Sequence, residues 1–428
     1  MSRKSVVNTR KDSTGSIKIL ILGGGFGGVY ALRHLTKALN HRKDIEITLV
    51  SDENFFLFSP LLHEVAAGGL EPRHIALLVR GLSRPDRFTF MQASVQKINL
   101  NERKVLTTAG TLDFDYLLLA LGSVRDLSGL CLEGGNVFTL KTLTDGRQIR
   151  NQIIKVFEQA SIEKDPEQQR QLLTFIVSGG GYIGVQLVTS LRDFIFKDLA
   201  KCYQTINRND IKIMLVEIEP KIVSPLHTKL GAYIMKDLQS TGIEVRLKSQ
   251  VTHSYPDHVK INGSEIVPTA TLIWVAGILS SPQVAQMDAR RDNIGRVKVN
   301  EYLEVLDFPN VYAVGDCAHF EDPKSGLPIP PKAHTGIRQA KIAVRNILAD
   351  SLGQEKRPYI YSNPFDIVPL GPAKGVFSFH SLRLYGLPAR FLWMAGYATL
   401  IPRTYNRARI LVDWLLSLIF GRDMTFLK

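Results

Sequence analysis

Cysteine is scarce in this chain of 428 residues, and the three that are present, Cys131, Cys202 and Cys317, lie far apart in the sequence. No CxxC or similar pair exists, so chemistry that requires two neighbouring thiols is not expected. We expect each cysteine to be a small buried apolar residue. No Cys/His cluster has the spacing of metal ligands, so the sequence predicts no metal site.

Long apolar runs are also lacking. The uncharged stretch 391–401 is shorter than the about 20 consecutive apolar residues that a membrane-spanning helix needs. Residues 1–16 are polar and basic and contain no apolar segment, so we expect a disordered tail and not a secretory signal. The 45% hydrophobic content is nevertheless ample for the cores of two or three domains.

Acidic residues are outnumbered by basic ones, which gives a formal net charge of +13. A nucleic-acid partner is not expected, because no basic run is interleaved with aromatic residues. An anionic lipid surface is the better partner, since each Lys or Arg near such a surface contributes about 1 kcal/mol. A generally basic, solvated surface is the alternative interpretation.

Two glycine fingerprints are the most informative feature that is present: GGGFGG at 23–28 and GGGYIG at 179–184. Each follows a β-rich apolar run, 17–22 or 175–177, and precedes apolar residues at helical spacing, which predicts a strand, a tight turn and a helix. In such a turn the first glycine permits the bend and the second admits a pyrophosphate. The third lets the helix pack on the strand, and the helix N–H groups bind the anion. The pattern predicts two dinucleotide-binding folds.

Acidic residues follow both fingerprints at places where a ribose would need an acceptor. Glu217 ends the apolar run 213–216, and an acid there favours NADH because the 2′-phosphate of NADPH would meet like charge. After the first fingerprint, the run 45–50 is followed by Ser51, Asp52 and Glu53. The ribose acceptor is ambiguous among these three, and we take Asp52 as the candidate.

A third motif, Gly315-Asp316, ends the short β run 310–314. A flavin enzyme would place such an aspartate against the ribityl chain and the next helix near the isoalloxazine ring. The motifs follow one another as first fingerprint, apolar run 117–123, second fingerprint, run 272–277 and Gly-Asp. In this order the chain resembles the two-dinucleotide-binding-domain flavoproteins, which bind FAD in the first fold and a nicotinamide nucleotide in the second.

The resemblance narrows to the type II NADH dehydrogenases, which are single-subunit NADH:quinone oxidoreductases. It rests on NFFLFSPLLHEVA at 54–66, on LKTLTD and IR within 140–150, and on PPKAH at 330–334. It implies an α/β fold with two Rossmann-like domains, for FAD and NADH, and a C-terminal helical membrane-attachment segment. It also implies hydride transfer from NADH to FAD, two-electron reduction of a membrane quinone without proton pumping, and a peripheral location on the cytoplasmic face of the cell inner membrane.

Three residues depart from the family pattern. Gln186 stands where many members have a glutamate near the nicotinamide, and its amide can form hydrogen bonds but cannot transfer a proton as an acid does. His334 stands where members usually have a glutamine beside the flavin and quinone, and an imidazole could donate to a quinone oxygen. Ser51 stands where many members have the acidic ribose ligand. We take Gln186 and His334 as the catalytic candidates.

The candidate cofactor-binding residues combine the motifs with the resemblance. For FAD they are Gly23, Gly25, Phe26, Gly27, Gly28, Asp52, Val95, Ala120, Gly122, Gly315, Asp316 and Ala333. For NADH they are Gly179, Gly181, Tyr182, Ile183, Gly184, Glu217 and Gly277.

The order of the motifs predicts five segments. They are a tail at 1–16, the first part of the FAD domain at 17–164, the NADH domain at 165–289, the second part of the FAD domain at 290–355 and a membrane-attachment domain at 356–428.

The C-terminal segment has the pattern of an amphipathic helix, with apolar residues at 410, 411, 414, 415, 418 and 419. Such a helix suits in-plane attachment to a membrane. Aromatic residues for the headgroup level would be Trp393, Tyr397 and Trp414, and phosphate contacts would come from Arg403, Arg407, Arg409 and Arg422. The alternatives for this stripe are a homodimer interface or simple core.

Two other functions remain open. One is an enzyme of the same architecture that reduces a soluble acceptor. The other is a non-catalytic flavoprotein that senses NADH, in which Gln186 and His334 would mark lost turnover.

Overall fold

The computed structural model describes residues 16–39, 42, 44–224, 226, 228–363 and 365–426. The predicted tail therefore lies, apart from Ser16, outside the described residues. The chain forms two compact units, each built from three stretches. Unit 1 contains Met1–Phe56, Leu77–Val124 and Ile278–Ser362, and unit 2 contains Leu57–Ala76, Arg125–Gly277 and Asn363–Lys428. The five segment boundaries predicted from the motifs stay a prediction.

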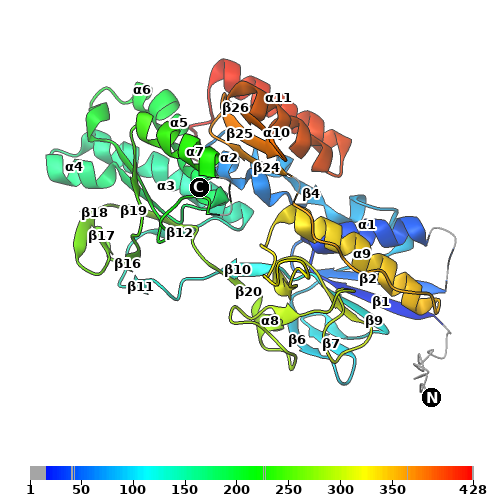
Figure 1. Ribbon diagram of the computed structural model, residues 1–428. Coiled ribbons are helices and arrows are strands. Elements are labelled where there is room, and N and C mark those ends of the chain that lie inside the picture. The colour runs from blue at the N-terminus through cyan, green and yellow to red at the C-terminus, as the bar shows by residue number, and fades with distance from the viewer. Residues whose placement is uncertain are drawn as a thin grey trace. The chain divides into compact units, whose positions relative to one another are not determined.

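Unit 1 is organised around a five-stranded sheet in the order β22-β9-β1-β2-β5, in which every neighbouring pair is parallel. Its strands are β1 (Ile17–Leu22), β2 (Ile45–Ser51), β5 (Thr89–Gln92), β9 (Tyr116–Leu119) and β22 (Val311–Ala313). All four residues of β9 are buried, as expected for a parallel strand covered on both faces. Helices α1 (Phe26–Ala38) and α9 (Ala333–Ser351) pack against each other beside this sheet (Figure 1).

Smaller elements complete unit 1. An antiparallel sheet contains β6 (Val95–Asn99), β7 (Lys104–Thr107) and β8 (Gly110–Asp113). The remaining short elements are β20 (Ile278–Ser280), α8 (Pro282–Ala285), β21 (Val297–Lys298), a 3-10 turn (Gly315–Cys317) and β23 (Ala318–His319). Where the chain passes from one unit to the other lie β3 (Phe55–Leu57), β4 (Ala76–Leu78) and β10 (Ser123–Arg125).

Unit 2 repeats the parallel design with a sheet in the order β12-β19-β13-β14-β15. Its strands are β12 (Val137–Thr139), β13 (Thr174–Ser178), β14 (Lys212–Val216), β15 (Ile243–Arg246) and β19 (Thr271–Trp274). The helices are α2 (Leu62–Ala66), α3 (Leu143–Ile162), α4 (Pro166–Leu172), α5 (Tyr182–Asp193), α6 (Ala200–Cys202) and α7 (Thr228–Ser240), with a π-helical turn at Phe194–Leu199. Helix α3 begins at a capping box, in which the Thr142 and Asp145 side chains each accept from the other's backbone N–H.

Two further sheets belong to unit 2. One has the order β11-β16-β17-β18 and contains β11 (Cys131–Leu132), β16 (Val251–Ser254), β17 (His258–Ile261) and β18 (Glu265–Pro268). The other is an antiparallel hairpin sheet of β24 (Phe365–Pro369), β25 (Gly375–Phe379) and β26 (Leu382–Tyr385). Helix α10 (Leu387–Leu400) packs on this second sheet, and α11 (Thr404–Phe420) follows it.

The terminal helices differ in part from the sequence expectation. Trp393 and Trp414 are 0% and 3% exposed, so the prediction that they lie at a lipid headgroup level is wrong. Their rings pack together instead, with centroids 5.6 Å apart. Within the described part of the chain, no helix combines the length and the apolar character needed to cross a membrane.

The three cysteines differ in their exposure to solvent. Cys317 is buried, as predicted, and its thiol donates to the carbonyl oxygens of Val314 and Leu119. Cys131 and Cys202 are exposed, so the prediction of burial is wrong for both. All three are free thiols.

Candidate functional site: two dinucleotide cradles and a buried polar cluster

The turn between β1 and α1 has the geometry of a dinucleotide cradle. Gly23 has a φ of +108°, a conformation that side chains disfavour, and a Cβ there would clash with the carbonyl of Ala120. A Cβ on Gly28 would clash with the carbonyl of Gly23, so the helix can lie this close to the strand only with glycine. At Gly25, by contrast, no described atom lies within 4 Å of the Cβ position. This open side is where the backbone can meet a pyrophosphate.

The turn between β13 and α5 repeats this geometry position by position. Gly179 has a φ of +111°, and a Cβ there would come within 2.8 Å of the Ala276 nitrogen. A Cβ on Gly184 would clash with the carbonyl of Gly179, and Gly181 again faces space free of described atoms. Among the described residues, no side chain caps the N-terminus of α1 or of α5. The helix N–H groups at both turns are therefore oriented to receive an anion.

Glu217 is the acidic group of the second cradle, and it is held beside the turn. One carboxylate oxygen accepts from the backbone N–H of Gly180, and the other accepts from the N–H of Glu219 at 2.8 Å. A fixed carboxylate at the end of the second strand is suited to the hydroxyls of a ribose. The role of Glu217 as the ribose ligand stays a prediction.

The strand register identifies the counterpart of Glu217 in the first cradle. Ser178 pairs with Val216, and Leu22 pairs with Val50, so Ser51 occupies the place that Glu217 has in the second cradle. The Ser51 hydroxyl lies 2.6 Å from where a Cβ of Gly24 would be. Asp52 is exposed and accepts from the N–H of Glu53 at 3.1 Å. By position Ser51 is the residue beside the turn, while a ribose contact from Asp52 stays a prediction.

The Gly-Asp motif lies at a corner where three backbones meet. Gly315 has a φ of +73°, and its N–H donates to the side-chain oxygen of Gln339 at 2.7 Å. Asp316 accepts from the Ser123 hydroxyl at 2.8 Å. A Cβ on Gly336 would lie 3.5 Å from the Cα of Gly315 and 3.9 Å from the Gly27 nitrogen. The N-termini of α1 and α9 thus meet the Gly-Asp motif.

Gln339 and Ser123 were not among the candidates from the sequence. Ser123 is a polar residue that follows the largely apolar stretch 116–122, which is the signal that could have identified it, whereas Gln339 lies among charged residues and carries no such signal. Gln339 is 1% exposed and Ser123 is 6% exposed, so each polar tip needs a specific partner. Their partners are the two residues of the Gly-Asp motif.

The other predicted FAD residues also belong to unit 1, and Val95 differs from the rest because it lies in the apolar core. Phe26 packs edge-on against Phe56 at 4.9 Å, and Ala333 begins α9. The carbonyl of Gly122 accepts from Ser281 at 3.2 Å. Val95 is 7% exposed and belongs to the apolar core of unit 1, so its side chain serves packing. A backbone contact from Val95 to FAD stays a prediction.

The predicted NADH residues lie along the first turns of α5 and the opposite strand end. The Tyr182 hydroxyl donates to Asp366 at 2.8 Å, and the Ile183 side chain is 42% exposed. Gly277 has a φ of +63°, and a Cβ there would lie 3.0 Å from the side chain of Asp126. The catalytic candidates are Gln186, which is 7% exposed on α5, and His334, which is half-buried in the first turn of α9. Their roles stay predictions.

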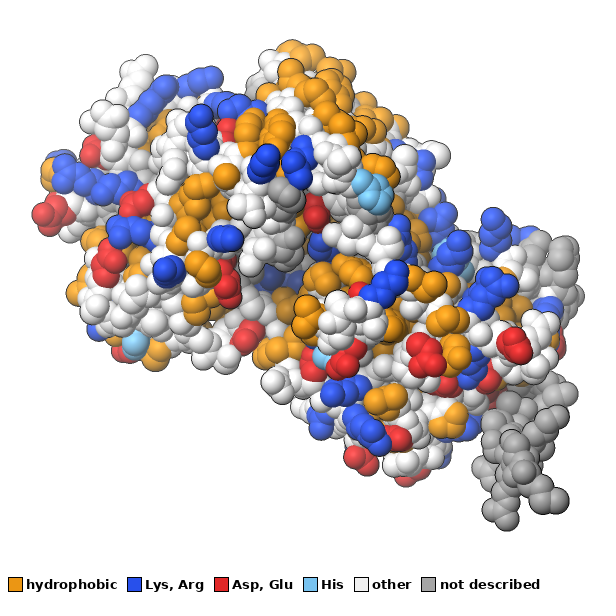
Figure 2. Space-filling view, viewed as in Figure 1, with side chains coloured by type: hydrophobic (Ala, Val, Ile, Leu, Met, Phe, Trp, Pro, Cys, Tyr) orange, Lys and Arg blue, Asp and Glu red, His pale blue; other side chains and the backbone are white. Residues whose placement is uncertain are grey.

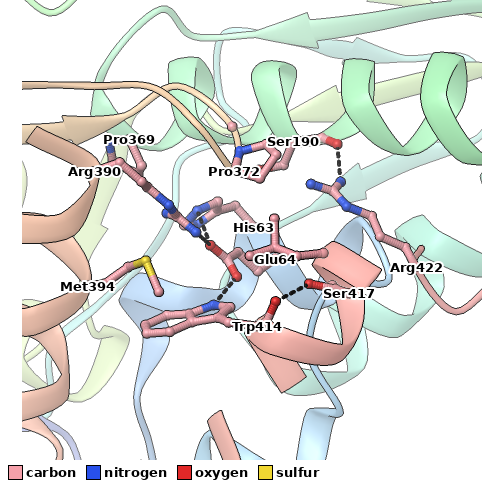
Figure 3. Close-up of a pocket in the computed structure, with 13 residues that line it drawn as sticks. His63, Glu64, Ser190, Pro369, Pro372, Arg390, Met394, Trp414, Ser417 and Arg422 are labelled. Carbon is pink, nitrogen blue, oxygen red and sulfur yellow. Dashed lines mark hydrogen bonds and ion pairs between the residues drawn. The ribbon is translucent and has the colours of Figure 1, made fainter. Parts of the chain in front are cut away.

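A buried polar cluster in unit 2, which the sequence did not reveal, surrounds Glu64 (Figure 3). The Arg390 guanidinium donates to one carboxylate oxygen at 3.0 Å and the Trp414 indole N–H donates to the other at 2.5 Å. Arg390 also lies 4.3 Å from the centroid of the Trp393 ring. A cavity of about 30 Å³ adjoins the cluster, which is room for one or two water molecules. The cluster joins α2 to both terminal helices.

Burial and neighbouring charges shift the pKa values of three groups in this cluster. Burial by itself raises the pKa of Glu64. The charges of Arg390 and His63 and the hydrogen bonds from Trp414 and Arg390 outweigh burial and hold the pKa below its usual value. Burial lowers the pKa of His63 to about 4, so the imidazole is neutral at neutral pH. Burial also lowers the pKa of Arg422, whose guanidinium donates to the carbonyl of Ser190 at 2.5 Å. The prediction that Arg422 binds lipid phosphate is therefore wrong, because its charge is directed inward.

Two parallel sheets with matching dinucleotide cradles and a Gly-Asp corner define a flavin- and nicotinamide-dependent oxidoreductase. The family model for pyridine nucleotide-disulphide oxidoreductases matches residues 17–346. The chain belongs to this family and, within it, to the type II NADH dehydrogenases. The predicted family, α/β fold class and FAD and NADH cofactors are thus confirmed.

Its relatives cover nearly the whole chain. A "Probable NADH dehydrogenase" of Dictyostelium discoideum is 30% identical over 95% of this chain and 91% of the relative. The "Type II NADH:quinone oxidoreductase Ndh" of Mycobacterium tuberculosis is 26% identical over 95% of this chain and 89% of the relative. Among solved structures, NDH2 of Plasmodium falciparum in complex with NADH has a TM-score of 0.87 at 19% identity, covering 96% of this chain and 100% of that one. This structural likeness supports the fold.

Proposed function

We propose that this protein is an FAD-dependent NADH:quinone oxidoreductase attached to the surface of a membrane. The observation that carries the proposal is the duplicated cradle, with the Glu217 carboxylate fixed beside the second turn and the neutral Ser51 beside the first. The carboxylate accepts ribose hydroxyls and repels a 2′-phosphate, so the second cradle selects NADH. The names of the relatives agree with this assignment.

The residues present fit both cofactors. Gly23, Gly25 and Gly28 with the N-terminus of α1 would hold the FAD pyrophosphate, and Asp316 would hold the ribityl chain. Bound FAD supplies hydride acceptance and two-electron transfer, which no side chain of the protein can provide. The chain contributes binding and orientation, and its three free cysteines leave no paired dithiol to take part in the reaction.

Two side chains would act on the substrates in this proposal. Gln186 would orient the nicotinamide through its buried amide, which can donate and accept but does not carry a proton between water and substrate. His334 would donate a hydrogen bond to a quinone oxygen from the first turn of α9. Proton delivery to the reduced quinone would then involve the imidazole or water.

The terminal helices present an apolar surface that supports membrane attachment. In Figure 2 hydrophobic side chains gather over α10 and α11. This apolar surface comprises side chains that are each at least 42% exposed, namely Leu387, Phe391, Leu392, Leu411, Val412, Leu415, Leu416, Leu418, Ile419 and Phe420. Exposed apolar area of this kind on one helix pair is typical of an interfacial helix. We place it on the cytoplasmic face of the cell inner membrane, and a homodimer is the alternative use of the same surface.

The function is tested by identifying cofactor and acceptor on the purified protein. The released flavin should be FAD, and NADH should be consumed in steady state only when a quinone is supplied. Consumption with a soluble protein or small-molecule acceptor but not with quinone would replace the quinone assignment. Flavin reduction without turnover with any acceptor would support the sensor alternative.

A further inference from the structure

Three potential metal ligands from two distant segments of the sequence meet on one edge of a small sheet in unit 2. Cys131 in β11 and His253 in β16 are direct partners in the parallel register, and Glu133 follows two residues after Cys131. A ligand atom from each of the three lies within 4.8 Å of the other two. The Cys131 sulfur and the Glu133 Oε1 are 3.8 Å apart. A thiol, an imidazole and a carboxylate form a mixed sulfur, nitrogen and oxygen donor set.

The hydrogen bonds of Thr252 determine which nitrogen of His253 can bind a metal. The Thr252 hydroxyl donates to the carbonyl of Lys260 at 3.2 Å and accepts from the N–H of Gly263 at 3.1 Å. With its one hydrogen donated to Lys260, the hydroxyl can only accept in its 3.1 Å contact with Nδ1 of His253. A neutral His253 then carries its hydrogen on Nδ1 and a lone pair on Nε2. Metal-binding histidines are held in the same way: one ring nitrogen donates its hydrogen to a neighbouring acceptor, and the other ring nitrogen binds the metal.

Glu133 is oriented in a similar way from the opposite strand. The Tyr255 hydroxyl donates to Glu133 Oε1 at 3.1 Å, and the Glu133 N–H donates to the carbonyl of Ser254 at 2.9 Å. The Tyr255 ring is nearly parallel to the His253 ring, with the planes 8° apart. Two of the three ligands therefore have fixed outer partners before any metal arrives.

We propose that Cys131, Glu133 and His253 form a solvent-open site for one zinc ion. Zinc binds thiolate sulfur at about 2.3 Å and imidazole nitrogen or carboxylate oxygen at about 2.0–2.2 Å, which puts the ligands of a tetrahedral site about 3.5 Å apart. The Cys131 sulfur and the Glu133 oxygen, 3.8 Å apart, are already close to that spacing. The Cys131 S–H bond breaks as the Zn–S bond forms, and the proton goes to solvent. Water occupies the fourth position.

Bound zinc would cross-link β11 and β16. Strand β11 has only two residues, and its pairing with β16 is limited to Cys131 with His253 and Leu132 with Ser254. A zinc ion bonded to both strands would join them beyond this short ladder. The proposal is independent of the redox function, because none of the three residues belongs to either cradle.

The proposal is tested on the full-length, FAD-loaded protein with its thiols kept reduced. Equilibrium dialysis against buffered free zinc, followed by elemental analysis, should give one zinc per chain for the wild type. Cys131→Ser and His253→Ala should each weaken binding by at least about 10-fold, as expected for loss of a direct ligand. Cys202→Ser is the matched control, because Cys202 is also an exposed free thiol but lies outside the cluster, and it should bind like the wild type.

Two further measurements make the outcome decisive. Thr252→Val should weaken zinc binding by about 10–100-fold, while Thr252→Ser, which keeps the hydroxyl, should restore it. X-ray absorption at the zinc edge should show one sulfur neighbour at about 2.3 Å in the wild type and none in Cys131→Ser. Equal binding by the wild type and Cys131→Ser, or no binding at micromolar free zinc, would overturn the proposal.

Discussion

The indole N–H of Trp414 donates to the buried carboxylate of Glu64 at 2.5 Å, and this bond connects α11 to α2 across most of the sequence. The other oxygen of Glu64 accepts from Arg390 of α10. One carboxylate therefore fixes both terminal helices. The exposed apolar surface over α10 and α11 depends on this arrangement, because Trp414 turns one face of α11 inward and leaves the other outside.

Glu64→Ala should destabilise the protein by about 3–5 kcal/mol, because the Arg390 charge would remain buried without its partner. The free energy of unfolding, measured in urea, reports this loss. Glu102→Ala is the control, since Glu102 is exposed and its removal should change stability by no more than about 0.5 kcal/mol. Similar effects from the two variants would contradict the role of the cluster.

Stability should decrease in acid through His63. Burial lowers its pKa from the ordinary 6.5 to about 4 in the folded protein, so the unfolded chain binds more protons between these two values. The free energy of unfolding should therefore fall as the pH is lowered from 6.5 towards 4, by on the order of 3 kcal/mol over the window. Glu64 acts in the same direction at lower pH, because its folded pKa is depressed and its stabilisation is lost as the carboxylate is protonated. His63→Phe should flatten the upper part of this profile, and an unchanged slope would contradict the assignment.

Two kinds of glycine substitution should separate folding from cofactor binding. Gly28→Ala places a methyl group against the Gly23 carbonyl and should lose both FAD and stability. Gly25→Ala places a methyl group where no described protein atom lies within 4 Å, so the protein should fold while FAD affinity falls. The flavin-to-protein absorbance ratio and urea unfolding measure the two effects. A fully FAD-loaded Gly25→Ala protein would show that the pyrophosphate lies elsewhere.

Glu217→Ala should raise the Michaelis constant for NADH by about 10-fold or more with a much smaller effect on turnover at saturation. The reason is that a charge-assisted hydrogen bond to ribose contributes about 1.5–3 kcal/mol to binding. Glu217→Gln keeps an acceptor without the charge, so its Michaelis constant for NADH should lie between those of the wild type and Glu217→Ala. Unchanged NADH affinity in both variants would remove Glu217 from the ribose site.

Substitutions that introduce charge into the apolar surface should release the protein from membranes. Leu415→Glu combined with Leu418→Glu introduces two acids into side chains that are 57% and 63% exposed, so folding should be little affected. Sedimentation with anionic vesicles should show loss of binding, while NADH oxidation with a short-chain quinone remains. Ile162→Glu, on α3 at 79% exposure, is the matched control and should still sediment. Loss of dimerisation in place of vesicle binding would assign the surface to a second copy.

The sequence predicted the two cradles well because each is a local pattern, in which strand, turn and helix follow within a few residues of the glycines. It left Ser51, Asp52 and Glu53 unresolved because the choice depends on strand register, and a shift of one residue changes which side chain meets the turn. The register places Ser51 beside the turn.

Contacts between distant segments were the part that sequence patterns could not supply. The spacing of the apolar residues between 410 and 419 predicts a helix but not which face is buried, and the buried Glu64, which accepts from Trp414 and Arg390, is far away in the chain. The meeting of Cys131, Glu133 and His253 depends on the pairing of β11 with β16 in the same way. Short-range motifs identified the chemistry, while long-range pairing determined the surface and the clusters.

In the proposed reaction electrons pass from NADH to FAD and then to quinone, and anaerobic stopped-flow absorbance follows both steps. The flavin is first reduced with NADH and then mixed with a short-chain quinone. Fast bleaching should be followed by fast recovery of the oxidised flavin spectrum. Fast bleaching with no recovery on quinone would contradict the quinone assignment, and no bleaching with NADH would contradict the function as a whole.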